Sequence, residues 1–168
     1  MRPIPSQERL KELFDYDPAS GQLIRRKTAE MSKTIAARFA GRPAGYQAPH
    51  GYVVVGIGRR LYYAHRIVWK WMYGSEPKEI DHVDGDGLNN RIANLRAATH
   101  GQNGVNKKTA RETLPRGVCL SATKGKFLGR IGANGRKLHL GTFDTPAQAH
   151  EAYQRAARIL HGEFARFD

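Results

Sequence analysis

The stretch EIDHVDGDGLNN at residues 79–90 places an acid and a histidine side by side, at Asp81 and His82. Hydrolysis of a phosphodiester needs a water nucleophile, a base that deprotonates it, and a positive centre that stabilises the developing charge. A neutral imidazole is a suitable base near neutral pH. A hard cation such as Mg²⁺ takes only a few protein oxygens, and Asp81 and Asn103 offer two. These three residues predict a metal-dependent phosphodiesterase site.

The elements around these residues are a strand, a loop, a second strand and a helix. KEIDH and NLRAAT have the composition of short strands, and DGDGLNN between them is a polar, glycine-rich loop. THGQNGVNKK can begin a helix, because Thr99 and Gln102 have the spacing of a capping box. Asn103 then falls in its first turn. Neighbouring residues on a strand point to opposite sides, so we expect Asp81 to bind the cation and His82 to activate water.

Residues 79–90 could also belong to other kinds of turn or metal site. DGDG by itself is equally typical of an ordinary Asp-rich turn. An EF-hand is excluded, since no glutamate follows Asp86 at the required distance. The single cysteine, Cys119, gives no cysteine pair for a zinc finger and no internal disulfide.

The charge of the chain indicates a polyanionic partner. Its 28 Lys and Arg against 15 Asp and Glu give a net charge of +13, and phosphates that are neutralised by such residues release counterions. Nucleic acid is the first candidate, although charge does not distinguish DNA from RNA. We expect no membrane partner and a cytoplasmic location, because MRPIPSQERLKELF lacks the apolar region of a secretory signal and no run approaches ~18 apolar residues.

The segment before the site contains recognisable elements and one poorly patterned stretch. SQERLKELFDYD has helical spacing, and QLIRR suits a short strand. Residues 28–50 carry several glycines and prolines, so we describe this N-terminal part, residues 1–50 taken broadly, as irregular. GYVVVGI and RLYYA predict a hairpin. AHRIVWKWMYG predicts a helix that ends at Gly74.

The last third of the chain has the pattern of a separate small unit. RGVCLS, KFLGRIG and RKLHLGTF predict three strands. A helix is expected over residues 146–161, because Thr145 can cap it and Gln148 completes a capping box. Its small apolar face should pack on the sheet, and consists of Ala149, Ala152, Tyr153, Ala156 and Leu160.

Around the opening motif the sequence resembles the HNH endonuclease family, whose ββα-metal motif is a short hairpin followed by a helix. The resemblance rests on the Asp81–His82 pair, on Asn94 within LNNRIANLR and on Asn103 nine residues later, with GYVVVGI and AHRIVW upstream. It implies that Asp81 and Asn103 bind one divalent metal, that His82 is the general base and that Asn94 clamps the loop. Asparagine in place of a final histidine is similar to the phage and homing subgroup, and implies Mg²⁺ or Mn²⁺ over zinc.

Residues 116–168 resemble the plant ethylene-response-factor (Apetala-type) DNA-binding domain. The resemblance is carried by RGV, GKFLGRI and LHLGTFDTPAQAHEAYQRAARILHGEFARFD. It implies a three-stranded sheet that enters the major groove with a helix behind it. Phe127 stands where the family has tryptophan, and several of its arginines are absent. The residues that we expect to contact DNA are Arg116, Lys126, Arg130, Arg136 and Lys137.

We therefore predict an α+β chain with an HNH nuclease domain at residues 1–110, whose core is residues 51–107. A linker at 111–115 leads to a three-stranded antiparallel sheet packed on one helix at 116–168. The predicted function is a metal-dependent DNA endonuclease of the phage or homing type, acting as a monomer on double-stranded DNA, in the host cytoplasm if phage-encoded. No small-molecule cofactor is expected. The alternatives are a catalytically inactive DNA-binding regulator and an RNA-directed nuclease.

Overall fold

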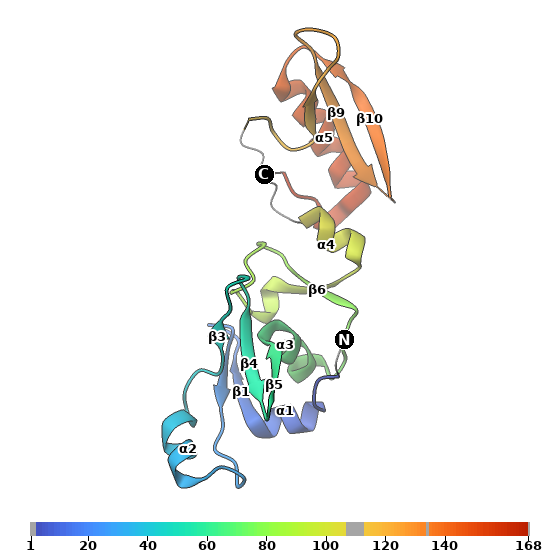
Figure 1. Cartoon of the computed structure of the whole chain (residues 1–168). Coiled ribbons are helices and arrows are strands. Elements are labelled where there is room, and N and C mark those ends of the chain that lie inside the picture. Colours follow the sequence, from blue (N-terminus) through green and yellow to red (C-terminus); the bar gives the residue numbers. More distant parts are fainter. Residues whose placement is uncertain (1–2, 107–112, 134, 168) are drawn as a thin grey trace. The chain divides into compact units, whose positions relative to one another are not determined.

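The computed structural model describes residues 3–106, 113–133 and 135–167, which form two compact units, residues 1–97 and 98–168. Both contain helices and small antiparallel sheets (Figure 1), so the α+β class is confirmed. The predicted domain boundaries at residues 107, 110 and 111 lie outside the described residues. In the described ranges, no helix combines the length and the apolar character that a membrane crossing requires.

The first unit begins with a helix and a hairpin that supply part of its core. Helix α1 (Gln7–Leu13) is capped by Ser6, whose Oγ accepts from Arg9 N at 3.2 Å. Strands β1 (Phe14–Asp17) and β2 (Gln22–Arg25) pair antiparallel. Phe14 and Leu10 are fully buried, so these elements anchor the unit.

The prediction that residues 28–50 are irregular was wrong in part. They contain α2 (Lys33–Phe39), which Ser32 caps by accepting from Ile35 N at 3.3 Å, and β3 (Tyr46–Gln47), which pairs with the next strand. The glycines and prolines that suggested irregular structure lie after α2 and around β3 rather than inside the helix. They therefore limit these elements without preventing them.

The predicted hairpin and helix that follow are confirmed. Strands β4 (Val53–Ile57) and β5 (Arg60–Tyr63) form the hairpin, and α3 (Ala64–Tyr73) ends at Gly74, whose φ of 72° is the left-handed conformation that glycine adopts at little cost. The inward residues of β4 and α3, Val55, Ile67 and Val68, are fully buried in the same cluster as Phe14.

The predicted strand, loop and strand are also present. Strand β6 (Glu79–His82) pairs with β7 (Leu95–Ala98) in a two-stranded sheet, and the 3₁₀ turn η1 (Ile92–Asn94) leads into β7. The next element, α4 (His100–Asn106), has the predicted capping box. Thr99 Oγ1 accepts from Gln102 N at 3.3 Å, and Gln102 Oε1 accepts from Thr99 N at 2.8 Å.

The second unit contains α4 and a three-stranded sheet backed by one long helix (Figure 1). Strands β8 (Val118–Leu120), β9 (Phe127–Ala133) and β10 (Arg136–Phe143) lie in the order β10-β9-β8. Helix α5 (Pro146–His161) packs on this sheet and is followed by the 3₁₀ turn η2 (Gly162–Phe164). Both halves of the predicted Thr145–Gln148 capping box are formed.

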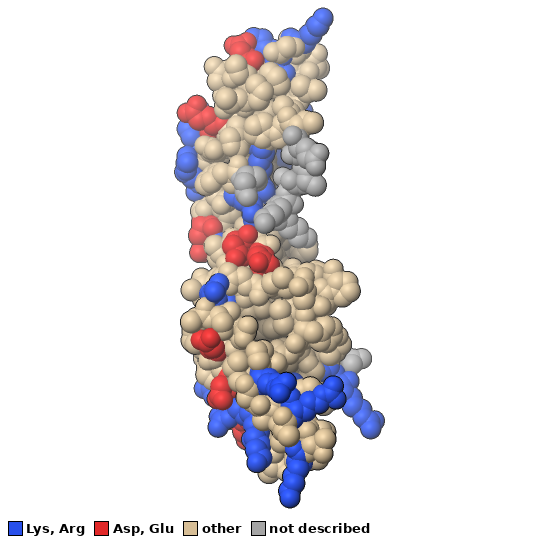
Figure 2. Space-filling view, turned by 90° about the vertical axis from the view of Figure 1, so that its left-hand side faces the viewer, with Lys and Arg blue, Asp and Glu red and all other residues tan. Residues whose placement is uncertain are grey.

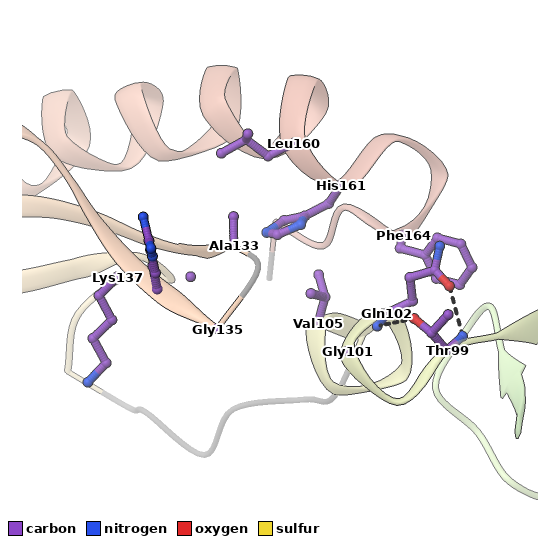
Figure 3. A pocket seen from close by; sticks show the side chains of 12 residues that line it. Thr99, Gly101, Gln102, Val105, Ala133, Gly135, Lys137, Leu160, His161 and Phe164 are labelled. Atoms are coloured by element: carbon purple, nitrogen blue, oxygen red, sulfur yellow. Dashed lines mark hydrogen bonds between the residues drawn. The ribbon is translucent and has the colours of Figure 1, made fainter.

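The buried face of α5 differs from the prediction at its C-terminal end. Ala149, Tyr153 and Ala157 are buried at four-residue spacing, whereas Leu160 is 44% exposed. Leu160 lies beside a pocket of about 580 Å³ between α4, the β9–β10 turn and the end of α5 (Figure 3). Leu160 therefore lines a pocket instead of packing against the sheet.

The excess of positive charge is spread over the surface. On the face in Figure 2, Lys and Arg side chains occur on both units, with Asp and Glu side chains among them. Charge alone therefore does not indicate which of these basic residues contact nucleic acid.

Candidate active site

Strand β6 brings Asp81 and His82 to its C-terminal end, and both side chains are buried, with 4% and 6% of their surface exposed. A charged or titratable side chain is rarely this buried without a partner. The structure gives each of the two a different partner, as the opposite directions of adjacent strand residues predict.

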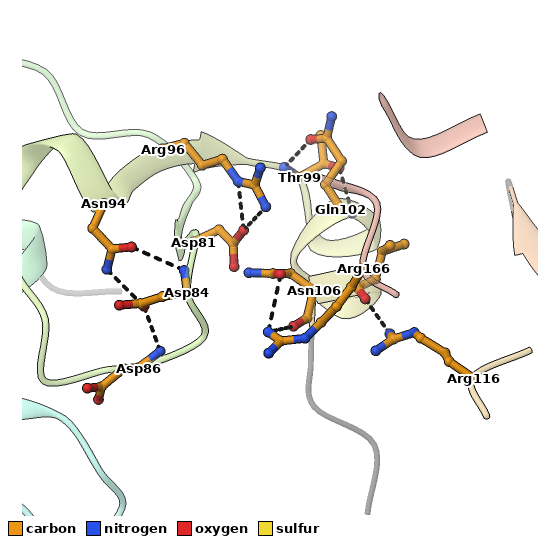
Figure 4. A network of polar contacts seen from close by, with 11 residues as sticks. Asp81, Asp84, Asp86, Asn94, Arg96, Thr99, Gln102, Asn106, Arg116 and Arg166 are labelled. Atoms are coloured by element: carbon orange, nitrogen blue, oxygen red, sulfur yellow. Dashed lines mark hydrogen bonds and ion pairs between the residues drawn. The ribbon is translucent and has the colours of Figure 1, made fainter. Parts of the chain in front are cut away.

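Asp81 is held by Arg96 on the neighbouring strand β7. Arg96 Nε and Nη2 both donate to Asp81 Oδ2, at 2.8 and 2.7 Å (Figure 4). These two hydrogen bonds orient the carboxylate, and the positive charge of Arg96 offsets its negative charge inside the fold. Sequence reasoning missed Arg96, although a basic residue in the strand predicted to lie near KEIDH was an available signal.

His82 is paired with Asn90 at the far end of the loop. His82 Nε2 lies 3.4 Å from Asn90 Oδ1, and Asn90 Nδ2 donates to Leu88 O at 3.1 Å, which fixes which amide atom faces the imidazole. An oxygen acceptor at Nε2 places the proton there and leaves the lone pair on Nδ1. Burial lowers the pKa of His82, and the Asn90 contact opposes this, so the ring is neutral at physiological pH.

Asn94 ties together the loop between β6 and η1. Its Oδ1 accepts from Asp84 N at 3.1 Å, and its Nδ2 donates to Asp84 Oδ1 at 3.0 Å (Figure 4). The same Nδ2 also donates to Asn89 O at 2.9 Å. Asp84 also accepts from Asp86 N and Asn89 Nδ2, at 2.8 and 2.7 Å. These bonds close the Asp-rich turn, and they are the contacts expected of a loop clamp.

The N-terminal hairpin supports the same loop from outside. Tyr16 Oη donates to Asn90 O at 3.1 Å and accepts from Ile92 N at 2.8 Å. Arg91 Nε donates to Ala19 O at 2.5 Å, and a Cβ at Gly21 would lie 2.5 Å from Arg91 N. The β1–β2 turn therefore approaches the loop so closely that only glycine fits there. No local pattern in residues 14–25 indicates this contact.

His65, in the first turn of α3, is a second buried histidine beside His82. It is 9% exposed, and its ring lies edge-on to His82 with 5.0 Å between centroids. The described part of the chain offers no hydrogen-bond partner to its Nδ1. The other face of the His65 ring stacks on Tyr63 at 5.4 Å. Burial, with smaller contributions from His82 and Arg66, lowers the pKa of His65 to about 3. His65 is thus a neutral side chain that packs against the imidazole of His82.

Burial of His65 predicts an acid-sensitive fold. The unfolded chain binds a proton at this residue below pH ~6.5, whereas the folded chain does so only near its pKa of about 3. The stabilisation is therefore complete above pH ~6.5 and is lost as the pH falls toward 3, at ~1.4 kcal/mol per pH unit. We expect His65→Phe, which keeps a ring, to remove this part of the slope of unfolding free energy between pH 7 and 5, measured by urea titration.

The internal control for this measurement is the range above pH ~7.5, where neither the folded nor the unfolded chain protonates His65 and the two proteins should have the same slope. Equal slopes for the wild type and His65→Phe between pH 7 and 5 would contradict the assignment.

Asn103 lies on α4, and so in the second unit, whereas Asp81 and His82 lie in the first. Its side chain is half-buried, and its backbone N donates to Thr99 O at 3.0 Å. No group of three or more His, Cys, Asp or Glu residues suited to a metal occurs within the described parts of the chain. A cation at Asp81 would therefore depend on amide oxygens, water and phosphate, the ligand set that Mg²⁺ accepts.

The basic residues predicted to contact DNA have different environments. The register pairs His139 with Arg130 and Lys137 with Gly132, so Arg130, Lys137 and His139 are exposed on one face of the sheet. Arg136 alternates with Lys137 and belongs to the other face. Lys126 pairs with the carboxylate of Asp144. The sheet thus brings together only part of the predicted set.

Arg116 is half-buried, and its Nη2 donates to Val105 O at 2.5 Å at the end of α4 (Figure 4). This contact within the second unit engages the guanidinium that we expected to meet DNA. Its role as a DNA contact stays a prediction.

Comparison with known proteins places the site residues in a named family. Residues 62–105, from β5 to α4, match the model of the HNH endonuclease family. The chain is similar to Protein 3.8 of Escherichia phage T7, with 35% identity over 107 residues, which cover 61% of this chain and 88% of that protein. It is also similar to an HNH endonuclease, L560, of Acanthamoeba polyphaga mimivirus, with 34% identity over 104 residues, or 60% of this chain and 54% of that protein.

A third relative is a protein of the SPbeta prophage of Bacillus subtilis whose name includes the words HNH homing endonuclease. It is 37% identical over 62 residues, which cover 33% of this chain and 36% of that protein. The family match ends at residue 105, so the likeness of residues 116–168 to the Apetala-type domain stays a prediction. The segment that matches contains all four residues predicted from the motif, and the chain belongs to the HNH endonuclease family.

Proposed function

We propose that this chain is a metal-dependent DNA endonuclease of the phage or homing type. The observation that carries the proposal is the pair at the end of β6, where Asp81 and His82 are buried and each is oriented by its own partner, Arg96 and Asn90. A strand end with a fixed carboxylate and a neutral, fixed imidazole supplies a ligand and a base at one position.

His82 is the proposed general base. Its Nε2 is directed at Asn90 Oδ1, so Nδ1 takes the proton from the attacking water, which then bonds to phosphorus. The bond from phosphorus to the 3′ oxygen breaks, and the 3′ oxygen takes a proton from solvent water, which leaves a 5′-phosphate and a 3′-hydroxyl. Asn94 and Asp84 hold the loop that carries Asn90, so the orientation of the base depends on residues that do not touch the substrate.

The residues present suit a hard divalent cation. Asp81 would contribute a carboxylate, which Arg96 holds through Oδ2, and Asn103 would contribute an amide oxygen. Carboxylate and amide oxygens with water and phosphate are the ligands that Mg²⁺ and Mn²⁺ prefer, whereas zinc prefers nitrogen and sulfur. When bound, the cation stabilises negative charge on the phosphate and on the departing 3′ oxygen.

Double-stranded DNA is the proposed substrate, held in part by the second unit. Arg130, Lys137 and His139 share an exposed face of the sheet, and a sheet with such a face can contact the major groove. A net charge of +13 supports binding to the phosphate backbone. Relatives from a phage and a prophage favour action in the cytoplasm of a bacterial host, and we propose that the chain acts as a monomer.

Cleavage of supercoiled plasmid tests the proposal. We expect nicked or linear DNA with Mg²⁺ or Mn²⁺, no product with EDTA, and recovery when excess Mg²⁺ is restored. Phosphate at the 5′ ends should permit ligation. Binding without cleavage at every metal concentration would instead identify a DNA-binding regulator, and preferential cleavage of duplex RNA over duplex DNA of the same sequence would identify an RNA-directed nuclease.

A further inference from the structure

Helix α4, which carries Asn103, has little intrinsic stability within the described residues. It has seven residues, two of them Gly101 and Gly104. Isolated helices of this length are unstable in water, and each interior glycine costs further stability. The Thr99–Gln102 capping box satisfies amides at its first turn. Hydrogen-bond donors at the carbonyls of its last described turn would therefore add to its stability.

Two arginines of the second unit supply those donors. Arg116 Nη2 donates to Val105 O at 2.5 Å, and Arg166 Nη1 donates to Asn106 O at 2.9 Å and lies 3.5 Å from Asn106 Oδ1 (Figure 4). Asn106 is only 5% exposed. Cations at the C-terminal end of a helix also interact favourably with its dipole. The end of α4 is therefore fixed by charged hydrogen bonds from outside the helix.

Both arginines are themselves fixed to α5. Gln154 Nε2 donates to His150 Nε2 at 2.9 Å, so the ring proton of His150 is on Nδ1. Nδ1 in turn donates to Arg116 O at 2.9 Å. Tyr153 Oη donates to Arg166 O at 3.1 Å, and the rings of His150 and Tyr153 stack. The backbone next to Arg116 is equally tight, because a Cβ at Gly117 would lie 2.2 Å from the Tyr153 ring.

We propose that Arg116 and Arg166 are positioning residues of the nuclease, which hold α4, and with it the metal ligand Asn103, on the sheet-and-helix body of the second unit. The inference rests on the proposed function, in which Asn103 binds the metal. Asn103 lies one turn before Asn106, so motion at the anchored end displaces it directly. The pocket of about 580 Å³ lies beside Gln102 and Val105 of α4 (Figure 3), and the two arginines add to the restraint that α4 receives from packing against η2.

The test uses the full chain with Arg166→Gln, because Arg166 is not among the residues expected to contact DNA. Loss of an outer support typically lowers metal affinity by about 10-fold to 100-fold. We expect the Mn²⁺ concentration that gives half-maximal cleavage to rise by at least about 10-fold, with most of the rate restored at saturating Mn²⁺. Mn²⁺ binding to the protein–DNA complex, measured by electron paramagnetic resonance with a non-cleavable phosphate, should weaken equally. Binding to DNA in EDTA should stay within about threefold.

Arg155→Gln is the matched control, since Arg155 is an exposed arginine of the same unit that pairs only with Glu151 in the described contacts. It should titrate like the wild type. Arg116→Lys, which keeps a cationic donor, should be affected less than Arg116→Gln. Adding Gly104→Ala to Arg166→Gln should restore part of the Mn²⁺ affinity, because a Cβ at Gly104 meets nothing within 4 Å and alanine strengthens the helix.

Superimposable Mn²⁺ titrations of wild type and Arg166→Gln would overturn the inference while leaving the nuclease intact. If Arg166→Gln loses DNA binding and thermal stability together, and Gly104→Ala does not rescue metal affinity, the arginine has a general structural role and the inference is also rejected. A wild type that never cleaves with metal would reject the proposed function itself.

Discussion

His82→Ala is expected to lower the rate of DNA cleavage by about 10³-fold or more, while binding to the same DNA changes by less than about threefold. General bases typically contribute 10²-fold to 10⁴-fold, and His82 is the imidazole at the end of β6 that Asn90 orients. Single-turnover cleavage of a labelled duplex at saturating protein measures the chemical step, and fluorescence anisotropy in EDTA measures binding.

Two controls separate loss of the base from a disturbed fold. His50→Ala removes an exposed histidine of the same unit and should cleave at the wild-type rate. Added imidazole should restore part of the activity of His82→Ala, because the substitution leaves room for a small base beside His65. Cleavage by His82→Ala within tenfold of the wild type would reject His82 as the base.

Asp81→Asn is expected to lower cleavage by about 100-fold or more at a fixed Mg²⁺ concentration, and to raise the concentration that gives half-maximal cleavage. The change removes the charge that binds a divalent cation but keeps an oxygen acceptor for Arg96. Asparagine is preferred to alanine here, because it keeps an oxygen that can accept from Arg96 and so disturbs the fold less. Metal titrations of cleavage and thermal unfolding of the variant measure the two effects separately.

The companion variant Arg96→Gln distinguishes a metal ligand from a purely structural ion pair. If Asp81 acts through the metal, Arg96→Gln relieves competition for the carboxylate and should leave cleavage within about tenfold of the wild type. If Asp81 serves only to neutralise Arg96, both variants should lose stability and activity alike. Asp86→Asn, a loop carboxylate that accepts only from Leu88 N in the described contacts, serves as a control for surface charge near the site.

Local patterns of the sequence predicted the elements of the site well. Alternating strands, the Gly74 stop and the capping boxes at Thr99 and Thr145 all depend on residues a few positions apart, and the structure confirms them. Helix α2 was missed, because nearby glycines and prolines outweighed a short helical pattern. Leu160 was assigned to the packed face, since helical spacing does not reveal the pocket beside the end of α5.

The partners of the site residues could not be predicted in the same way. Arg96 meets Asp81 only through the register of β6 and β7, and His65 meets His82 only because α3 packs against the end of β6. Tyr16 reaches Asn90 across 74 positions of the chain. Such contacts depend on tertiary packing, for which neither periodicity nor residue spacing provides a signal.

The attachment of the β1–β2 turn to the Asp-rich loop limits how this nuclease can be transplanted. Tyr16 and Ala19 bond to the loop, and Gly21 lies against Arg91. A chimera that transfers only the family segment, residues 62–105, to another DNA-binding domain would lack the contacts that support the loop carrying Asn90. The smallest cutting module that can be exchanged as a cassette therefore begins upstream of this turn, well before the segment that identifies the family.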